Sequence, residues 1–240
     1  MDITKVTRPV RKLLPLKTCG AVIVAAGNAS RMGGIDKVMA PLGGEPMIVR
    51  TVRAFQNCDA IASIVIVTRE DLIRPISGLC RDMSKVTAVV CGGSSRQESV
   101  HLGLNALPKG TKLAAVHDGA RPLVSWQVID RVVRAANTYG GAAPAIPVKD
   151  TIKVVKGGLV ESTPDRASLQ AVQTPQVFDF DLLRGALKKA EEDKAQVTDD
   201  CSAVERLGMK IKIVEGDERN LKVTTPLDLK IAELLLEETK

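Results

Sequence analysis

Short apolar segments alternate along this chain with longer amphipathic ones, and this alternation constrains the fold more than any other feature. The apolar segments are continuous runs, which is typical of strands buried on both faces of a sheet. Ser125 and Thr225-Pro226 stand where helix N-terminal caps are expected. The pattern predicts an α/β protein with a Rossmann-like, mostly parallel sheet and helices on both faces. The expected strands are 20–25, 64–68, 86–90, 113–117, 142–147 and 210–214, and the expected helices are 46–57, 71–81, 95–107, 125–139, 179–194 and 225–238.

One region interrupts this rhythm and predicts a protruding β-hairpin arm. Residues 151–155 and 159–162 flank Gly157-Gly158, a good two-residue hairpin turn. Because a two-stranded hairpin is marginally stable alone in water, we expect it to pack against a second subunit or against its own sheet. Residues 19–240 are therefore expected to form a single domain with an inserted arm at about 148–172, preceded by a basic extension, 1–18.

Charge and composition argue against several classes of protein. The net charge is +6, but residues 1–18 alone carry +4, so the charge of the rest gives little support for a nucleic-acid partner. One Trp, one Tyr and three Phe offer few stacking platforms for bases. No apolar run approaches the roughly 20 residues of a membrane span, and the start lacks a secretory apolar region. Five scattered cysteines fit a reducing compartment, so we expect a cytoplasmic protein.

The first apolar segment ends in a loop of small residues that suits a bound anion. The stretch from Val22 reaches Ala25-Ala-Gly27, then Arg31, and then Lys37. Backbone N–H groups approach an anion closely where no side chain intervenes, and two cations beside them suit a triphosphate. The loop matches neither the P-loop nor the dinucleotide-binding pattern.

Two further polar clusters follow apolar segments, where ligands bind in parallel sheets. Residues 91–99 combine two glycines with Ser95, which is expected to cap a helix, and the sequence suits the sugar or base of a nucleotide. Asp118 follows the segment 113–117 and is well placed to hold Mg²⁺. His117, just before it, is expected to be a packed strand residue with its hydrogen bonds made.

The remaining polar residues indicate a site that stabilises negative charge. Thr198-Asp199-Asp200 precedes a helical stretch and is expected to cap it, and Lys222 lies in a strand-like segment, 220–224, where a lone Lys usually faces solvent. The chain has no nucleophile elbow and no convincing Ser/His/Asp arrangement. Cations with one or two aspartates suit phosphoryl or nucleotidyl transfer.

Together these clusters resemble one family, the 2-C-methyl-D-erythritol 4-phosphate cytidylyltransferases of the non-mevalonate isoprenoid pathway. The resemblance runs from about Cys19 to the C-terminus. Its segments are Ala25-Ala-Gly with Arg31-Met32, Gly92-Gly with Arg96 and Ser99, His117-Asp-Gly-Ala-Arg-Pro122, Pro147-Val-Lys-Asp-Thr151, Gln173-Thr-Pro-Gln176, Thr198-Asp199 and Asn220-Leu-Lys-Val-Thr224. Each segment is weak alone, but seven in order are a strong signal.

The resemblance implies a nucleotidyltransferase fold, CTP and a polyol phosphate as substrates, Mg²⁺ as cofactor, and a homodimer formed through the β-arm. Arg31 and Lys37 match the pair that stabilises the transition state, and Arg166 and Lys222 match the pair that positions the acceptor phosphate. The implied nucleotide-binding residues are Ala25, Ala26, Gly27, Gly93, Arg96, Ser99, Asp118, Ala120 and Arg121, with Asp118 also near the metal. The implied acceptor-binding residues, besides Arg166 and Lys222, are Thr151, Thr174 and Thr198.

The loop departs from the family pattern, and other functions stay open. Ala29 stands where the family commonly has a second Gly, and Asp36 stands before Lys37 where the family commonly has Pro. The negative charge of Asp36 would partly offset the positive charge of Lys37 unless the carboxylate points away. The alternatives are a cytidylyltransferase for another polyol phosphate such as ribitol 5-phosphate, a sugar-1-phosphate nucleotidyltransferase using another nucleotide, and a non-catalytic nucleotide-binding module. Nucleic-acid binding through residues 1–18 is the least favoured alternative.

Overall fold

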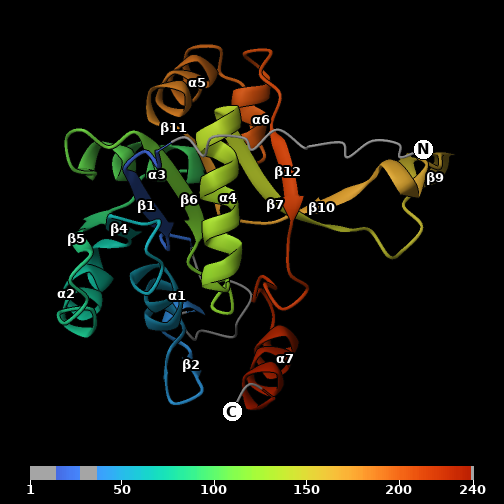
Figure 1. Cartoon of the computed structure of the whole chain (residues 1–240). Helices are drawn as coiled ribbons and strands as arrows, with labels where there is room; N and C mark the ends of the chain where they lie inside the picture. The colour runs from blue at the N-terminus through green and yellow to red at the C-terminus, as the bar shows by residue number, and fades with distance from the viewer. Residues whose placement is uncertain (1–14, 28–36, 239–240) are drawn as a thin grey trace, which may run out of the picture.

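One eight-stranded sheet forms the centre of the computed structural model, which describes residues 15–27 and 37–238 (Figure 1). The strand order is β10-β7-β11-β6-β1-β4-β5, and β12 pairs with β7. Neighbours β6, β1, β4 and β5 are parallel, as the alternating sequence predicts. The strands are β1 Cys19–Val24, β4 Ser63–Thr68, β5 Val86–Cys91, β6 Leu113–Asp118, β7 Gly141–Pro147, β10 Gln170–Val172, β11 Gln176–Asp179 and β12 Lys212–Glu215.

Helices cover both faces of the sheet, which confirms the predicted architecture. On β1, Ala21 and Ile23 join the core formed with α1, α2 and α4, whereas Val22 joins the core formed with α3, α5 and α6. This alternation follows from the two-residue period of a strand. The predicted caps are present, since Ser125 accepts a hydrogen bond from the backbone of α4 and Thr225 from that of α7. The helices are α1 Met47–Gln56, α2 Glu70–Leu79, α3 Arg96–Ala106, α4 Trp126–Tyr139, α5 Phe180–Glu192, α6 Asp200–Glu205 and α7 Pro226–Glu237.

Two parts of the sheet differ from the sequence-based expectation. The short strand β11 lies between β6 and β7 and is antiparallel to both, although its sequence predicts no strand. Residues 220–224, expected to be strand-like, form no strand; Val223 N–H donates instead to the Ala120 carbonyl in the loop after β6. This contact draws the segment toward the end of β6. The small ribbon of β2 Pro41–Leu42 and β3 Glu45–Pro46 lies beside it, with α7 packed nearby.

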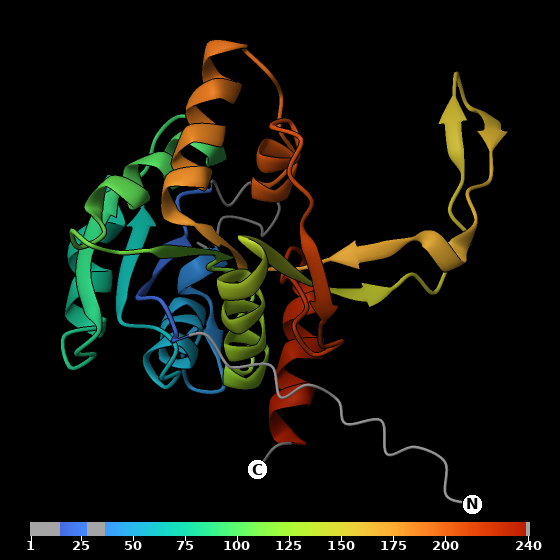
Figure 2. The same ribbon diagram turned by 45° about the horizontal axis from the view of Figure 1, so that its top comes forward.

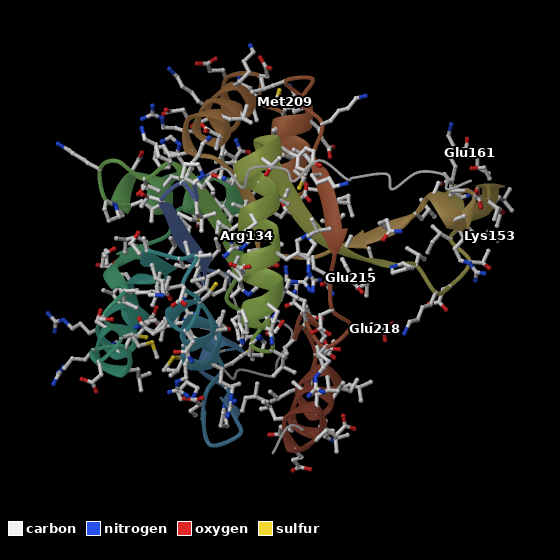
Figure 3. All side chains as sticks on the ribbon, in the orientation of Figure 1. Arg134, Lys153, Glu161, Met209, Glu215 and Glu218 are labelled. Atoms are coloured by element: carbon white, nitrogen blue, oxygen red, sulfur yellow. The ribbon has the colours of Figure 1, made fainter. Side chains whose placement is uncertain are left out.

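The segment after β7 leaves the main sheet. Strands β8 Val154–Lys156 and β9 Leu159–Ser162 pair only with each other among the described residues, and Figure 2 shows the pair projecting away from the body. Both turn glycines, Gly157 and Gly158, have positive φ, at 57° and 81°, as a tight hairpin turn requires. Lys153 and Glu161 lie at this outer end of the molecule in Figure 3.

Two expectations about the environment of the chain can be compared with the structure. All five cysteines are free, and only Cys91 is exposed. Within residues 15–27 and 37–238, no helix has the length and apolar character needed to cross a bilayer. Most of the expected extension, 1–18, lies outside the described residues; Lys17 Nζ pairs with Asp179 Oδ2 at 3.2 Å.

Candidate active site

The loops that follow β1, β5 and β6 surround a cavity of about 590 Å³ at the carboxyl ends of these parallel strands. This is the position at which α/β sheets bind ligands. Lys37, at the start of a 3₁₀ helix (Lys37–Met39), and Lys222 also line the cavity. Ten residues with sequence-predicted roles therefore line one cavity: Ala25, Ala26, Gly27, Lys37, Gly93, Arg96, Ser99, Asp118, Ala120 and Lys222.

The β5 loop is shaped by close packing and by its own hydroxyls. A Cβ atom at Gly92 would lie 2.5 Å from the Cβ of Ala26, so only glycine lets the β1 and β5 loops approach this closely. Ser95 accepts from Glu98 N–H and caps α3, as predicted. Ser99 Oγ accepts from Gly93 N–H at 3.1 Å and donates to the Ser95 carbonyl at 2.8 Å. In this structure, Ser99 therefore organises the loop that faces the cavity.

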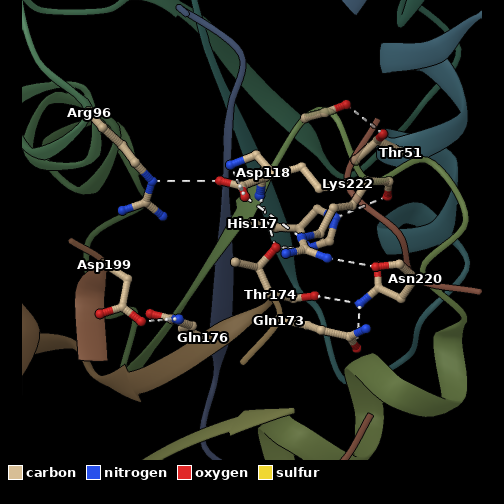
Figure 4. Close-up of polar contacts among 12 residues, drawn as sticks. Thr51, Arg96, His117, Asp118, Gln173, Thr174, Gln176, Asp199, Asn220 and Lys222 are labelled. Atoms are coloured by element: carbon tan, nitrogen blue, oxygen red, sulfur yellow. Dashed lines mark hydrogen bonds and ion pairs between the residues drawn. The ribbon is translucent and has the colours of Figure 1, made fainter. Parts of the chain in front are cut away.

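Asp118, at the end of β6, is the centre of the site's charge (Figure 4). Its Oδ2 lies 2.8 Å from Lys222 Nζ and 3.7 Å from Arg121 Nε, and its Oδ1 lies 3.6 Å from Arg96 Nε. Burial alone would raise the pKa of Asp118, but the charges of Lys222 and Arg96 outweigh it and lower the pKa to about 2. The carboxylate is therefore ionised at neutral pH. Lys222 reaches it from the 220–224 segment, and its side chain remains 44% exposed.

A short chain of hydrogen bonds fixes the backbone of Asp118. His117 is fully buried, and burial lowers its pKa to about 3, so its ring is neutral. Its Nε2 lies 3.2 Å from the Arg121 carbonyl, which can only accept, so Nε2 carries the proton and Nδ1 accepts from Thr174 Oγ1 at 2.9 Å. Thr174 Oγ1 in turn accepts from Asp118 N–H at 3.2 Å. The predicted packed role of His117 is confirmed.

A second carboxylate, Asp200, pairs with Arg96. Arg96 Nη2 lies 2.7 Å from Asp200 Oδ2, so its guanidinium group lies between Asp200 and Asp118. Burial raises the pKa of Asp200, although Arg96 opposes this change. Asp199 caps α6 by accepting from Ser202 N–H, as expected. No charge partner of Asp200 was predicted from the sequence, in which the residue stood out only as part of the Thr198-Asp199-Asp200 segment.

Several predicted residues do not lie at the cavity wall. Arg166, in the 3₁₀ helix Arg166–Ser168, is exposed and donates from Nη1 to the Lys149 carbonyl at 2.9 Å. Thr151 and Thr198 are also exposed and do not line the cavity. Arg121 and Thr174 stand behind Asp118, the former donating from Nη1 to the Asn220 carbonyl at 2.7 Å.

Part of the predicted loop cannot be compared with the structure. Arg31 lies outside the described residues, and so do the two departures from the family pattern, Ala29 and Asp36. The predicted pairing of Arg31 with Lys37 at a triphosphate therefore stays a prediction.

Comparison with known proteins gives the family directly. A model of the 2-C-methyl-D-erythritol 4-phosphate cytidylyltransferase family, IspD, matches residues 19–238. The chain belongs to this family. The family resemblance expected from the sequence is therefore confirmed, and it covers every residue that lines the cavity.

Relatives and solved structures of this family match most of the chain. The 2-C-methyl-D-erythritol 4-phosphate cytidylyltransferase of Symbiobacterium thermophilum is 46% identical over 219 residues, which cover 90% of this chain and 92% of the relative. That of Geobacillus thermodenitrificans is 46% identical over 220 residues, covering 90% and 96%. The crystal structure of 4-diphosphocytidyl-2C-methyl-D-erythritol synthase from Anaerococcus prevotii superposes with a TM-score of 0.84 at 29% identity, covering 92% and 96%.

Proposed function

We propose that this enzyme transfers the cytidylyl group of CTP to 2-C-methyl-D-erythritol 4-phosphate and releases pyrophosphate. The observation that carries the proposal is the convergence of Lys37, Arg96 and Lys222 on one cavity beside an ionised Asp118. Membership of the cytidylyltransferase family supports the choice of CTP and a polyol phosphate.

The reaction is an in-line displacement at the α-phosphorus of CTP. An oxygen of the acceptor's phosphate monoester forms a bond to that phosphorus, and the bond to the β-phosphate oxygen breaks as pyrophosphate leaves. The second pKa of a phosphate monoester is about 6, so the nucleophile is already an anion at neutral pH and needs no general base. This agrees with the site, where His117 is buried with both ring nitrogens engaged and Asp118 is paired with cations.

The catalytic difficulty is then the approach of two anions. Lys37 lines the cavity, as does Gly27, and we assign it, with Arg31, to the α-phosphate of CTP. Lys222 pairs with Asp118, and we assign it, with Arg166, to the acceptor phosphate. Fixed cations stabilise the negative charge that accumulates when the two phosphates meet.

The donor set of the cavity suits Mg²⁺ held mainly by the nucleotide. Among residues 15–27 and 37–238, no group of three or more His, Cys, Asp or Glu forms a complete metal site. Mg²⁺ commonly binds one or two carboxylates together with substrate phosphates. Asp118 Oδ1 lies 3.6 Å from Arg96 Nε, longer than a hydrogen bond, and so retains capacity for the ion or its bound water. When bound, Mg²⁺ would neutralise phosphate charge.

We further propose a homodimer in which the arm of one subunit completes the site of the other. Arg166 and Thr151 are exposed on the arm and do not line the cavity of their own chain. The hairpin also exposes apolar side chains, with Leu159 77% and Val160 61% exposed, which a second subunit would cover. We place the enzyme in the cytoplasm, since its free cysteines suit a reducing compartment.

The test is pyrophosphate release with each of four nucleoside triphosphates against a panel of acceptors. We expect release with CTP and 2-C-methyl-D-erythritol 4-phosphate in the presence of Mg²⁺. A preference for ribitol 5-phosphate would replace the proposed acceptor, and a preference for another triphosphate would replace CTP. Nucleotide binding without release on any acceptor would favour a non-catalytic module.

A further inference from the structure

The tetrapeptide Gln173-Thr-Pro-Gln176 runs from the end of β10 to the first residue of β11 and contacts Asp118 through Thr174. Gln173 and Thr174 are 5% exposed, and Gln176 is 2% exposed. Buried polar side chains need hydrogen-bond partners within the protein. The partners of these three residues therefore show which other segments of the chain the tetrapeptide holds in place. Thr174 holds the backbone of Asp118, as described above.

Gln173 holds the segment that carries Lys222. Its Nε2 donates to the Asp217 carbonyl at 2.8 Å, and its Oε1 accepts from Asp217 N–H at 3.2 Å, so its amide pairs with Asp217 as a neighbouring peptide group would. Asn220 completes the connection, because its Nδ2 donates to Gln173 Oε1 at 3.3 Å and to the Thr174 carbonyl at 2.8 Å. Lys222 follows two residues later and reaches Asp118.

Gln176 holds the segment on the other side of the cavity. Its Nε2 donates to Asp199 Oδ2 at 2.7 Å, and its Oε1 accepts from Cys201 N–H at 2.9 Å. Asp200 lies between these two anchored residues and pairs with Arg96. In Figure 4, Arg96 and the Gln176–Asp199 pair lie on one side of Asp118, and Lys222 and Asn220 lie on the other.

We infer that Gln173 and Gln176 are positioning residues with separate duties, Gln173 for the acceptor-binding Lys222 and Gln176 for the nucleotide-binding Arg96. Their amides connect two distant segments, 217–220 and 199–201, to one tetrapeptide. The inference rests on the proposed function, which gives Lys222 to the acceptor phosphate and Arg96 to CTP. Neither glutamine lines the cavity, so each acts through the residue it holds.

The test compares Gln173→Met with Gln176→Met, because methionine has a similar shape but cannot replace the amide's hydrogen bonds. A small displacement of a binding group costs a factor of up to about 100, so we expect Gln173→Met to raise KM for the acceptor at least about tenfold while the Kd for CTP changes less than about twofold. Gln176→Met is expected to do the opposite. CTP affinity is measured by calorimetric titration and acceptor KM by pyrophosphate release.

Gln56→Met is the matched control. Gln56 also bridges two segments, donating to Ser84 Oγ at 3.0 Å and accepting from Lys85 N–H at 2.9 Å, but it lies on α1 and does not line the cavity. Both constants are expected to stay at wild-type values in this variant. If a methionine variant does not fold, Gln173→Asn and Gln176→Asn are used, since the amide stays neutral but is one methylene too short to keep both hydrogen bonds.

Two results would overturn the inference. One is a parallel change of acceptor KM and CTP Kd in both variants, which is what a general loss of structure produces. The other is wild-type constants in folded variants. Failure of the proposed function has a different signature: the wild type would release no pyrophosphate from CTP and 2-C-methyl-D-erythritol 4-phosphate, while the calorimetric arm would still test Gln176 through CTP binding.

Discussion

Replacing His117 by glutamine should change how the stability of the protein depends on pH. His117 is fully buried among hydrogen-bonded groups, and burial lowers its pKa from 6.5 to about 3. Between these two pH values the unfolded chain binds a proton that the folded protein does not, so stability falls as the pH falls below 6.5. The full difference corresponds to about 5 kcal/mol, at about 1.4 kcal/mol per pKa unit.

Only part of that difference is needed for the measurement. Between about pH 7 and about pH 5, protonation of the unfolded histidine lowers the free energy of unfolding of the wild type by about 2 kcal/mol. Glutamine has an amide that can donate and accept but does not titrate, so His117→Gln should lose this part of the pH dependence. Carboxylates titrate equally in both proteins, and the difference between the two curves isolates His117.

The assay is urea denaturation followed by circular dichroism at several pH values in this range. His101→Gln, which removes the partly exposed histidine of α3, is measured alongside as a histidine substitution outside the site. Parallel curves for the wild type and His117→Gln would refute the argument, because they would mean that the buried ring takes up its proton as readily as a ring in the unfolded chain.

Three further predictions follow from the site and the core. Lys37→Ala and Arg31→Ala should each lower kcat at least about 10²-fold without lowering the thermal midpoint, as expected when one charge-stabilising donor is removed. Mixing inactive Arg166→Ala and Lys37→Ala subunits should restore activity in heterodimers, since one composite site would then carry both wild-type residues. Gly103→Ala should lower the free energy of unfolding, measured by urea denaturation, by about 1–3 kcal/mol, because the new Cβ would meet Val22 and lie 2.7 Å from Val67. Gly185→Ala, where the new Cβ meets open space, should raise it by up to about 1 kcal/mol by stabilising α5.

Each of these predictions has an outcome that contradicts it. Near-wild-type turnover in Lys37→Ala or Arg31→Ala would remove that residue from the transition state. Heterodimers that form but stay inactive would argue against shared sites. Equal effects of the two glycine substitutions would show that the close approach of α3 to the sheet does not limit the side chain at Gly103.

The sequence by itself determined the features that depend on neighbouring residues. Continuous apolar runs defined the parallel strands of the sheet, and Ser95, Ser125 and Thr225 marked the starts of α3, α4 and α7. These signals are readable because caps and strand periodicity act over a few residues. Most of the predicted residues that line the cavity follow β1, β5 or β6, since the ends of parallel strands meet at one edge of a sheet.

Only the tertiary structure decided which polar groups meet. Arg96 and Asp200 are 104 residues apart in sequence, and no local pattern distinguishes their pairing from a surface charge. Lys222 lies in one of the family segments, but only folding brings that segment to the loop after β6 and pairs the lysine with Asp118. Gln173 and Gln176 gave no chemical signal either, because an amide takes its role from the partners that folding brings to it. Burial makes such long-range pairs necessary, since a polar group removed from water must find its partner within the protein.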